Sequence, residues 1–225
     1  MTASELNLTA TALLFDMDGT LVDSTPVVER TWRRFAGRHG LDPERVLSTA
    51  HGRRTGETVA MYAPEGVDVA AETARLEAEE IEDVEGITAI PGAAELLASL
   101  PAGRWAVVTS AGRVLAERRM AAAGLTLPAT VVSADDVTAG KPSPEGYRTA
   151  AERLGVAAGG TVVFEDAETG LLAAVAAGAT AVVVGEHRGP ATVGLARVAD
   201  LRGLTVTETG QGGLRLTRVR PLAPA

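Results

Sequence analysis

The chain has 225 residues, of which 46% are hydrophobic, and its formal net charge is −8 at pH 7. It has no cysteine, which excludes disulfides, thiolate nucleophiles and cysteine-ligated zinc. The acidic balance and the lack of a basic tract argue against a nucleic-acid partner. No apolar run is long enough to span a membrane, and residues 1–10 lack the pattern of a secretion signal. We therefore expect a cytoplasmic monomer, built as one large domain or two small ones, with no nucleic-acid or membrane partner.

An apolar run, Leu13-Leu14-Phe15, ends in two aspartates that are one residue apart, Asp16 and Asp18. Such a run is typical of a buried strand in an α/β sheet. Open α/β sheets bind ligands beyond the carboxyl ends of their strands, so the two carboxylates are expected at the rim. Neighbouring carboxylates repel unless a divalent cation or a proton offsets their charge. The pattern indicates either a reactive site or an ordinary polar turn, since Asp-Gly is also a common turn dipeptide.

Residues 25–86 carry helical patterns and no strand signal. Pro26 at a helix start and Gly40 at its end delimit the first helix. A second helix is expected to begin at Asp42-Pro43, a third follows Thr55 as its cap, and the last one covers residues 70–85. The acidic residues of this last helix are interpreted as a solvated face, because they spread around the helix: Glu77, Glu79, Glu80, Glu82, Asp83 and Glu85. The whole stretch indicates a compact helical insertion after the first strand.

From residue 93 onward, apolar strand patterns alternate with helical ones, as in βαβ units with right-handed crossovers. The expected strands are 104–110, 130–132, 161–164 and 181–184, and the expected helices end at Leu100, Gly124, Leu154 and Ala177. Residues 204–208 and 214–219 flank a glycine-rich turn and alternate in polarity, which predicts a C-terminal β-hairpin. The fold class is therefore α/β, with a Rossmann-like parallel sheet flanked by helices, a small helical insertion and a terminal hairpin.

Polar residues follow four of the predicted strands: Asp16 and Asp18, Thr109 and Ser110, Lys141, and Glu165 and Asp166. One edge of a parallel sheet would gather them. Oxygen ligands suit Mg²⁺ that shares its shell with a substrate phosphate, whereas zinc would favour histidine or cysteine. The three histidines lack metal-ligand spacing: His39, His51 and His187.

Lys141 is the only lysine of the chain, since every other strongly basic residue is arginine. Arginine and lysine differ where a compact ammonium on a flexible stem is needed. A single lysine can arise by chance, but its setting, Gly140-Lys141-Pro142, favours a specific role. The chain has no Gly-x-x-x-x-Gly-Lys-Ser/Thr loop, so this lysine is not that of a nucleotide-binding P-loop.

Four motifs, in this order, resemble those of the haloacid dehalogenase superfamily of phosphohydrolases: Asp16-Met17-Asp18-Gly19-Thr20, Val107-Val108-Thr109-Ser110, Gly140-Lys141-Pro142 and Phe164-Glu165-Asp166. The helical insertion resembles the cap of the subgroup that includes β-phosphoglucomutase, phosphoglycolate phosphatase and small sugar phosphatases. Residues 51–55 and 85–92 look most like those of sugar-phosphate and glycerol-phosphate phosphatases. The resemblance implies a core of residues 1–17 and 88–225 and a helical cap of residues 18–87.

The resemblance also implies catalytic roles. Asp16 would be the nucleophile that forms an aspartyl-phosphate, and Asp18 would protonate the leaving oxygen and then activate water. Thr109 and Lys141 would hold the phosphoryl oxygens. A dehalogenase is disfavoured, because relatives that break carbon–halogen bonds lack an aspartate at the position of Asp18.

The resemblance further implies a metal site and a substrate site. Asp16, Asp166 and the backbone carbonyl of Met17 would bind Mg²⁺, with Glu165 in support. Arg54 of the cap is the first candidate for contacting substrate, followed by His51 and Arg53, with Ser110 on the core side. Each of these cap residues could instead be a solvent-facing residue at a helix end.

The leading hypothesis is an Mg²⁺-dependent phosphatase acting on a small sugar or polyol phosphate. A phosphosugar mutase on the same fold is the nearest rival, because the two differ only in whether the phosphoryl group goes to water or back to a sugar. A non-catalytic phosphosugar-binding regulator is a third hypothesis, although a pure binder would have no need of Asp18.

Overall fold

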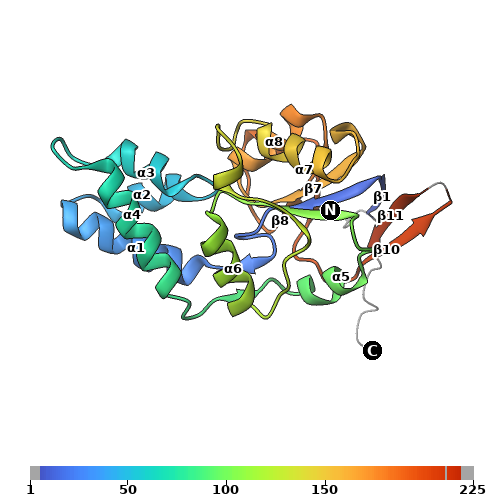
Figure 1. Ribbon diagram of the computed structural model, residues 1–225, viewed down its shortest axis with the longest axis horizontal. Helices are drawn as coiled ribbons and strands as arrows, with labels where there is room; N and C mark the ends of the chain where they lie inside the picture. Colours follow the sequence, from blue (N-terminus) through green and yellow to red (C-terminus); the bar gives the residue numbers. More distant parts are fainter. Residues whose placement is uncertain (1–5, 211, 219–225) are drawn as a thin grey trace.

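The structure is a computed structural model that describes residues 6–210 and 212–218. Its centre is a six-stranded parallel sheet with the strand order β6-β5-β2-β7-β8-β9 (Figure 1). These strands are β2 (Ala12–Phe15), β5 (Trp105–Val108), β6 (Thr130–Val132), β7 (Thr161–Glu165), β8 (Thr180–Val184) and β9 (Ala196–Val198). The predicted parallel α/β fold is thereby confirmed. Among the described residues, none of the helices is both long and apolar enough to cross a membrane.

Helices cover both faces of this sheet (Figure 1). On one face lie α7 (Glu145–Arg153) and α8 (Glu168–Ala177), and on the other α5 (Ala93–Ser99) and α6 (Arg113–Ala122). Successive side chains of β2 alternate between the two layers, so that Leu14 belongs to the α7–α8 side while Leu13 and Phe15 belong to the α5–α6 side. Because β2 is buried on both faces, its sequence is continuously apolar. Asp16, the next residue, is thus attached to a rigid central strand.

The segment after β2 folds into four helices that lie to one side of the sheet (Figure 1). They are α1 (Thr25–His39), α2 (Pro43–Ala50), α3 (Thr55–Tyr62) and α4 (Val69–Glu82). A hydrophobic cluster of their own holds them together, with Trp32, Phe35 and Leu76 at its centre. Gly40 ends α1 in the left-handed conformation, as expected, whereas Thr55 is the first residue of α3 and not its cap. The predicted helical insertion is therefore present, with its own small core.

Four short strands were absent from the sequence-based expectations. β3 (Val22–Asp23) pairs with β4 (Thr88–Ala89) where the chain enters and leaves the helical region, and β9 extends the main sheet. β1 (Asn7–Ala10) pairs with β11 (Gly213–Arg218), so the predicted hairpin of β10 (Leu204–Thr209) and β11 is part of a three-stranded antiparallel sheet. Unlike the predicted strands of the main sheet, these four segments contain no run of adjacent large apolar residues, so they carry no strand signal in the sequence. Val219, at the end of the predicted hairpin, lies outside the described residues, as does residue 211 in its turn.

The solvated face expected for the last helix is only partly correct. Glu77, Glu82 and Glu85 are exposed, as expected. Glu79 and Asp83 instead form ion pairs with arginines of α1. For Glu80 the expectation was wrong, because this side chain is buried (4% exposed) and pairs with an arginine of α6. Spacing around a helix predicts which residues share a face, but it does not reveal whether another helix covers that face.

Candidate active site

The carboxyl ends of β2 and β7 bring three acidic side chains together. Asp16 follows β2, Glu165 ends β7 and Asp166 is the next residue. One carboxylate oxygen from each of them lies within 4.8 Å of the other two. A cleft of about 660 Å³ opens at this edge of the sheet, and Asp16, Asp18 and Asp166 line it. The predicted gathering of strand-end residues is therefore seen in the structure.

Lys141 joins this cluster from the loop before α7. Its Nζ donates to Oδ1 of Asp16 and, at 2.5 Å, to Oε1 of Glu165. The lysine is only 7% exposed. Burial opposes its positive charge, but the carboxylates of Asp16 and Glu165 outweigh that effect and raise the pKa of the ammonium. Lys141 is thus a fixed positive charge beside the candidate nucleophile.

The acidic cluster brings three carboxyl groups against one ammonium. Burial raises the pKa of Asp16 to about 8, although the Lys141 ammonium pulls in the opposite direction. Burial and the carboxylate of Glu165 likewise raise the pKa of Asp166 well above its ordinary value. A divalent cation would stabilise the ionised forms, and a donor set made only of oxygen atoms fits a hard cation. The residues present therefore fit a divalent metal site.

The chain turns closely around this site at Gly19. A Cβ atom there would lie 2.0 Å from Oδ2 of Asp166, and the residue has a φ of +83°. The Met17 carbonyl, which the sequence analysis assigned to the metal, accepts backbone hydrogen bonds from Leu21 at 2.8 Å and Val22 at 2.9 Å. These bonds close the turn. A carbonyl oxygen has two lone pairs, so these hydrogen bonds are compatible with metal binding by Met17, which stays a prediction.

Glu165 has protein donors on both of its oxygens. Oε1 accepts from Lys141 and, at 3.0 Å, from the hydroxyl of Tyr147, and Oε2 accepts from the backbone N–H of Asp166 and of Ala167, both at 3.0 Å. Glu165 therefore orients Lys141 and the loop that carries Asp166. Sequence reasoning missed Tyr147, which is 1% exposed. The spacing of apolar residues on α7 places Tyr147 on the buried face of that helix, but it does not show where the hydroxyl points.

The end of β5 provides the predicted hydroxyl pair. Thr109 is buried, its backbone N–H donates to Val132 at 2.9 Å, and its Oγ1 accepts from the N–H of Ala111 at 3.1 Å. Ser110 Oγ instead donates to the carbonyl of Gly52, in the loop between α2 and α3, at 3.0 Å. Both residues line the cleft. Ser110 thus joins the helical region to the core at the edge of the site.

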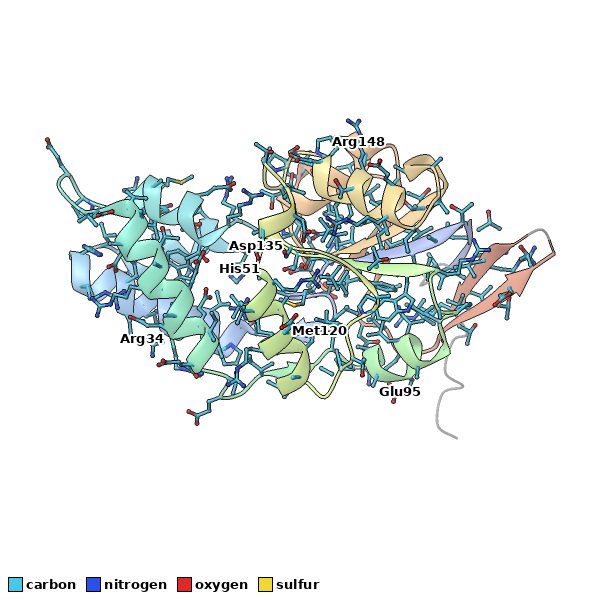
Figure 2. All side chains as sticks on the ribbon, in the orientation of Figure 1. Arg34, His51, Glu95, Met120, Asp135 and Arg148 are labelled. Atoms are coloured by element: carbon cyan, nitrogen blue, oxygen red, sulfur yellow. The ribbon has the colours of Figure 1, made fainter. Side chains whose placement is uncertain are left out.

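Three cap residues were predicted to face substrate, and the structure places them differently. His51 and Arg53 line the cleft, and Figure 2 shows His51 where the helical region meets the core. Arg54 instead donates through Nη2 to the carbonyl of Val137 at 2.8 Å and through Nη1 to that of Thr138 at 3.3 Å. Its guanidinium lies beside a small cavity next to the main cleft. Substrate contact by these residues remains a prediction.

Asp18 lies in the cleft and is held on one oxygen. Its Oδ1 accepts from Ser24 Oγ at 2.6 Å and pairs with Nη1 of Arg119 at 3.0 Å. Arg119, on α6, is 4% exposed and also pairs with Glu80. Sequence reasoning missed this arginine, although Leu115 four residues earlier placed it on the buried side of its helix.

A buried carboxylate next to a fixed ammonium can attack a phosphate ester, and a second acid in the same cleft can protonate the group that leaves. A Rossmann-like parallel sheet with this arrangement at its edge is typical of a hydrolase that transfers phosphoryl groups. A family model described as haloacid dehalogenase-like hydrolase matches residues 10–178, and the chain belongs to that family. The family resemblance drawn from the four motifs is therefore confirmed.

Relatives of the chain include named phosphatases. Hexitol phosphatase A of Escherichia coli is 47% identical over 175 residues, which cover 76% of this chain and 81% of that protein. Glycerol-1-phosphate phosphohydrolase 2 of Saccharomyces cerevisiae is 37% identical over 192 residues, or 79% of this chain and 76% of that protein. The solved structure of a candidate β-phosphoglucomutase from Thermotoga maritima aligns with a TM-score of 0.63 at 30% identity, covering 83% of this chain and 93% of the other.

Proposed function

We propose that the protein is an Mg²⁺-dependent phosphatase that hydrolyses small sugar or polyol phosphate monoesters through an aspartyl-phosphate. The observation that carries this proposal is the placement of Asp16 against Lys141, with Asp18 in the same cleft. The names of the relatives, a hexitol phosphatase and a glycerol-1-phosphate phosphohydrolase, support the substrate class.

In the proposed first step, a carboxylate oxygen of Asp16 attacks phosphorus and the bond to the leaving oxygen breaks. Asp18 donates its proton to that oxygen, so the product leaves as an alcohol. In the second step, Asp18 takes a proton from water, which attacks the aspartyl-phosphate and releases inorganic phosphate. Lys141 and Thr109 hold the phosphoryl oxygens, since such transfers depend mainly on positioning and charge neutralisation.

In our proposal, the side chains of Asp16 and Asp166 and the backbone carbonyl of Met17 would hold Mg²⁺. The ion supplies charge neutralisation for the phosphoryl group when it is bound. Glu165 supports the site indirectly, through the backbone N–H groups and the ammonium that it binds.

We also propose that residues 18–87 act as a cap over a core formed by residues 1–17 and 88–225. The separate hydrophobic cluster of α1–α4 and the β3–β4 ribbon at the two connections support this division. His51 and Arg53 line the cleft from the cap side, while Arg54 and Ser110 bridge cap and core. The cap would thus determine which ester fits above Asp16. A cytoplasmic location and a monomeric state remain predictions.

A phosphate-release screen tests the proposed function directly. Phosphorylated hexitols, hexoses, glycerol and an aryl phosphate are incubated with the protein in Mg²⁺ and, separately, in excess chelator. We expect release from polyol or sugar phosphates in Mg²⁺ only. Absence of release from the whole panel by folded, Mg²⁺-loaded protein would leave the regulator hypothesis in its place.

The mutase alternative has one observation in its favour, the similarity to the Thermotoga maritima structure. Phosphorus NMR of a hexose phosphate incubated with the protein distinguishes the two reactions. A phosphatase produces inorganic phosphate, whereas a mutase produces an isomeric sugar phosphate. We expect inorganic phosphate to be the main product.

A further inference from the structure

A chain of three charged side chains runs from the helical region to the candidate acid. Glu80 on α4 pairs with Nη2 of Arg119 on α6 at 2.8 Å, and Nη1 of the same arginine pairs with Oδ1 of Asp18 at 3.0 Å. The side chains of Glu80 and Arg119 are each 5% exposed, while that of Asp18 is 29% exposed. All three residues line the cleft. These ion pairs therefore connect two buried side chains between α4 and α6 with Asp18, which is partly exposed in the cleft.

The contacts of Asp18 are one-sided. Ser24 Oγ donates to Oδ1 at 2.6 Å, and Arg119 approaches that same oxygen. Among the described residues, no hydrogen bond is made to Oδ2. The hydrogen bond from Ser24 and the ion pair with Arg119 both restrain Oδ1, so the carboxylate has less freedom to move and its second oxygen is left unbonded by any described residue in the cleft. Oδ2 is thus the atom available for proton exchange.

The guanidinium is suited to this arrangement. Its planar fork carries donors in fixed directions, so one arginine can hold two carboxylates at once. Glu80 restrains Arg119 from α4, and Thr55 Oγ1 donates to the other oxygen of Glu80 at 3.4 Å. Within the part of the chain that the structure describes, Nε of Arg119 is buried without a partner. The two ion pairs are therefore what keep this side chain in place.

We infer that Arg119 is a positioning residue, held from the cap by Glu80, that fixes Asp18 through Oδ1 so that Oδ2 faces the leaving oxygen. This inference rests on the proposed function, in which Asp18 is the acid and base. It assigns to Glu80, on a cap helix, an indirect part in the chemistry of the core. Arg119 itself forms no bond with the reacting atoms.

A simpler role for Arg119 would be to balance the buried charge of Glu80, and paired variants separate the two roles. Arg119→Met leaves Glu80 without its partner and should lower the unfolding temperature. The double variant Glu80→Gln/Arg119→Met removes both charges and should recover most of that loss. Arg119→Lys keeps a positive charge opposite Glu80, but a single ammonium lacks the fork that reaches both carboxylates. The matched control is Arg118→Met. Arg118 is an exposed neighbour on α6 whose side chain donates to the carbonyl of Ile81 at 3.3 Å.

The informative readout is the rate of phosphoryl-enzyme formation in rapid-quench experiments with two probes, glycerol 1-phosphate and p-nitrophenyl phosphate. The alkyl ester needs a proton for its leaving oxygen, whereas the aryl ester does not. In the Lys and double variants we expect the rate from glycerol 1-phosphate to fall by about 10- to 100-fold, as for a displaced catalytic group. The rate from p-nitrophenyl phosphate and the KM for glycerol 1-phosphate should stay within about threefold of the parent. Arg118→Met should match the parent on both probes.

Because the two rates are compared on the same folded fraction, partial unfolding of a variant does not change their ratio. Parental rates from glycerol 1-phosphate in Arg119→Lys or in the double variant would overturn the inference and leave Arg119 as a partner of Glu80 only. Equal losses on both probes would overturn it too, since Arg119 would then act on the whole site. Asp18→Asn separates these failures from that of the proposed function. If Asp18→Asn forms phosphoryl-enzyme normally from glycerol 1-phosphate, the proposed acid is itself wrong.

Discussion

The ammonium of Lys141 lies against a carboxylate oxygen of Asp16, a residue 125 positions earlier in the chain. The parallel sheet makes this contact possible, because the end of β2 and the loop before α7 meet at one edge. The only lysine of the chain is therefore buried between the candidate nucleophile and Glu165. Replacement of Lys141 should therefore have a large effect.

We predict that Lys141→Arg is strongly impaired although it keeps the charge. The guanidinium is broader than the ammonium, and the position is only 7% exposed, so the larger group cannot contact Asp16 and Glu165 in the same way. A barrier increase of about 2–4 kcal/mol is the scale for losing one well-placed electrostatic group. Steady-state kcat with glycerol 1-phosphate measures it. The control is Arg148→Lys, on the outer side of α7 (Figure 2), and parental kcat in Lys141→Arg would reduce Lys141 to a structural residue.

We predict that turnover requires Mg²⁺ or a close substitute such as Mn²⁺, and that Ca²⁺ inhibits. The acidic cluster offers oxygen atoms only, and the larger and looser coordination shell of Ca²⁺ would disturb the in-line geometry of attack. The protein is stripped with chelator, dialysed and assayed with each cation added back. Isothermal titration with Mg²⁺ gives a second readout, since Asp166→Asn should weaken binding. Full turnover of the stripped protein would contradict a metal-dependent site.

Sequence reasoning found the strand-end residues because their signals are local. Asp16, Thr109 and Asp166 each end an apolar run, and a parallel sheet gathers such ends at one edge. The contact between Glu80 and Arg119 had no such signal, because the two residues lie 39 positions apart on different helices. Whether a charged residue on a helix is solvated or buried depends on which other helix packs over it.

The orientation of side chains was equally hidden. The apolar spacing of α7 directs Tyr147 inward, but only the packed structure shows that its hydroxyl donates to Glu165 at 3.0 Å. Similarly, Arg54 belongs to a loop that faces the core, and it contacts backbone carbonyls of that core. Motifs thus located the site, while tertiary packing decided which neighbours support it.

We predict a specific acid sensitivity at Asp136. Its carboxylate accepts from the backbone N–H and the hydroxyl of Ser133, both at 2.8 Å, and pairs with Arg153 at 2.7 Å. The Ser133 backbone hydrogen bond, opposed in part by burial and assisted by Arg153, lowers the pKa of Asp136 from 3.8 to about 2. A lowered pKa in the folded state stabilises the fold above the unfolded-state pKa, and that stability is lost as the pH falls toward 2.

Urea unfolding of the parent and of Asp136→Asn at several pH values measures this effect. At pH 5 to 6, the parent should be more stable by about 2 kcal/mol, the scale that follows from this pKa difference. The difference should shrink between pH 4 and pH 2, because Asp136 becomes protonated in the folded parent. Other titrating groups are common to both proteins and therefore cancel in the comparison. A gap that stays constant over this range would show that the carboxylate is not ionised preferentially in the folded state.

Asp16 and Asp18 should fail in different ways when each is replaced by asparagine. Asp16→Asn removes the nucleophile, so no phosphoryl-enzyme should form from any ester. Asp18→Asn keeps the nucleophile but removes the acid and base, whose contribution is typically about 10²- to 10⁴-fold. Alkyl phosphates should suffer this loss in the first step, whereas aryl phosphates, which leave without a proton, should still phosphorylate Asp16.

With an aryl phosphate, Asp18→Asn should therefore show a burst of the phenolic product followed by slow turnover, because water lacks its base in the second step. Mass spectrometry of the quenched protein should find one added phosphoryl group, on the peptide that contains Asp16. The contact with Lys141 favours Asp16 as the phosphorylated residue, since the ammonium lies beside a carboxylate oxygen of Asp16 and would also neutralise charge on a phosphoryl group there. Label on another residue, or turnover by Asp16→Asn, would refute the covalent mechanism itself, whatever the result for Asp18.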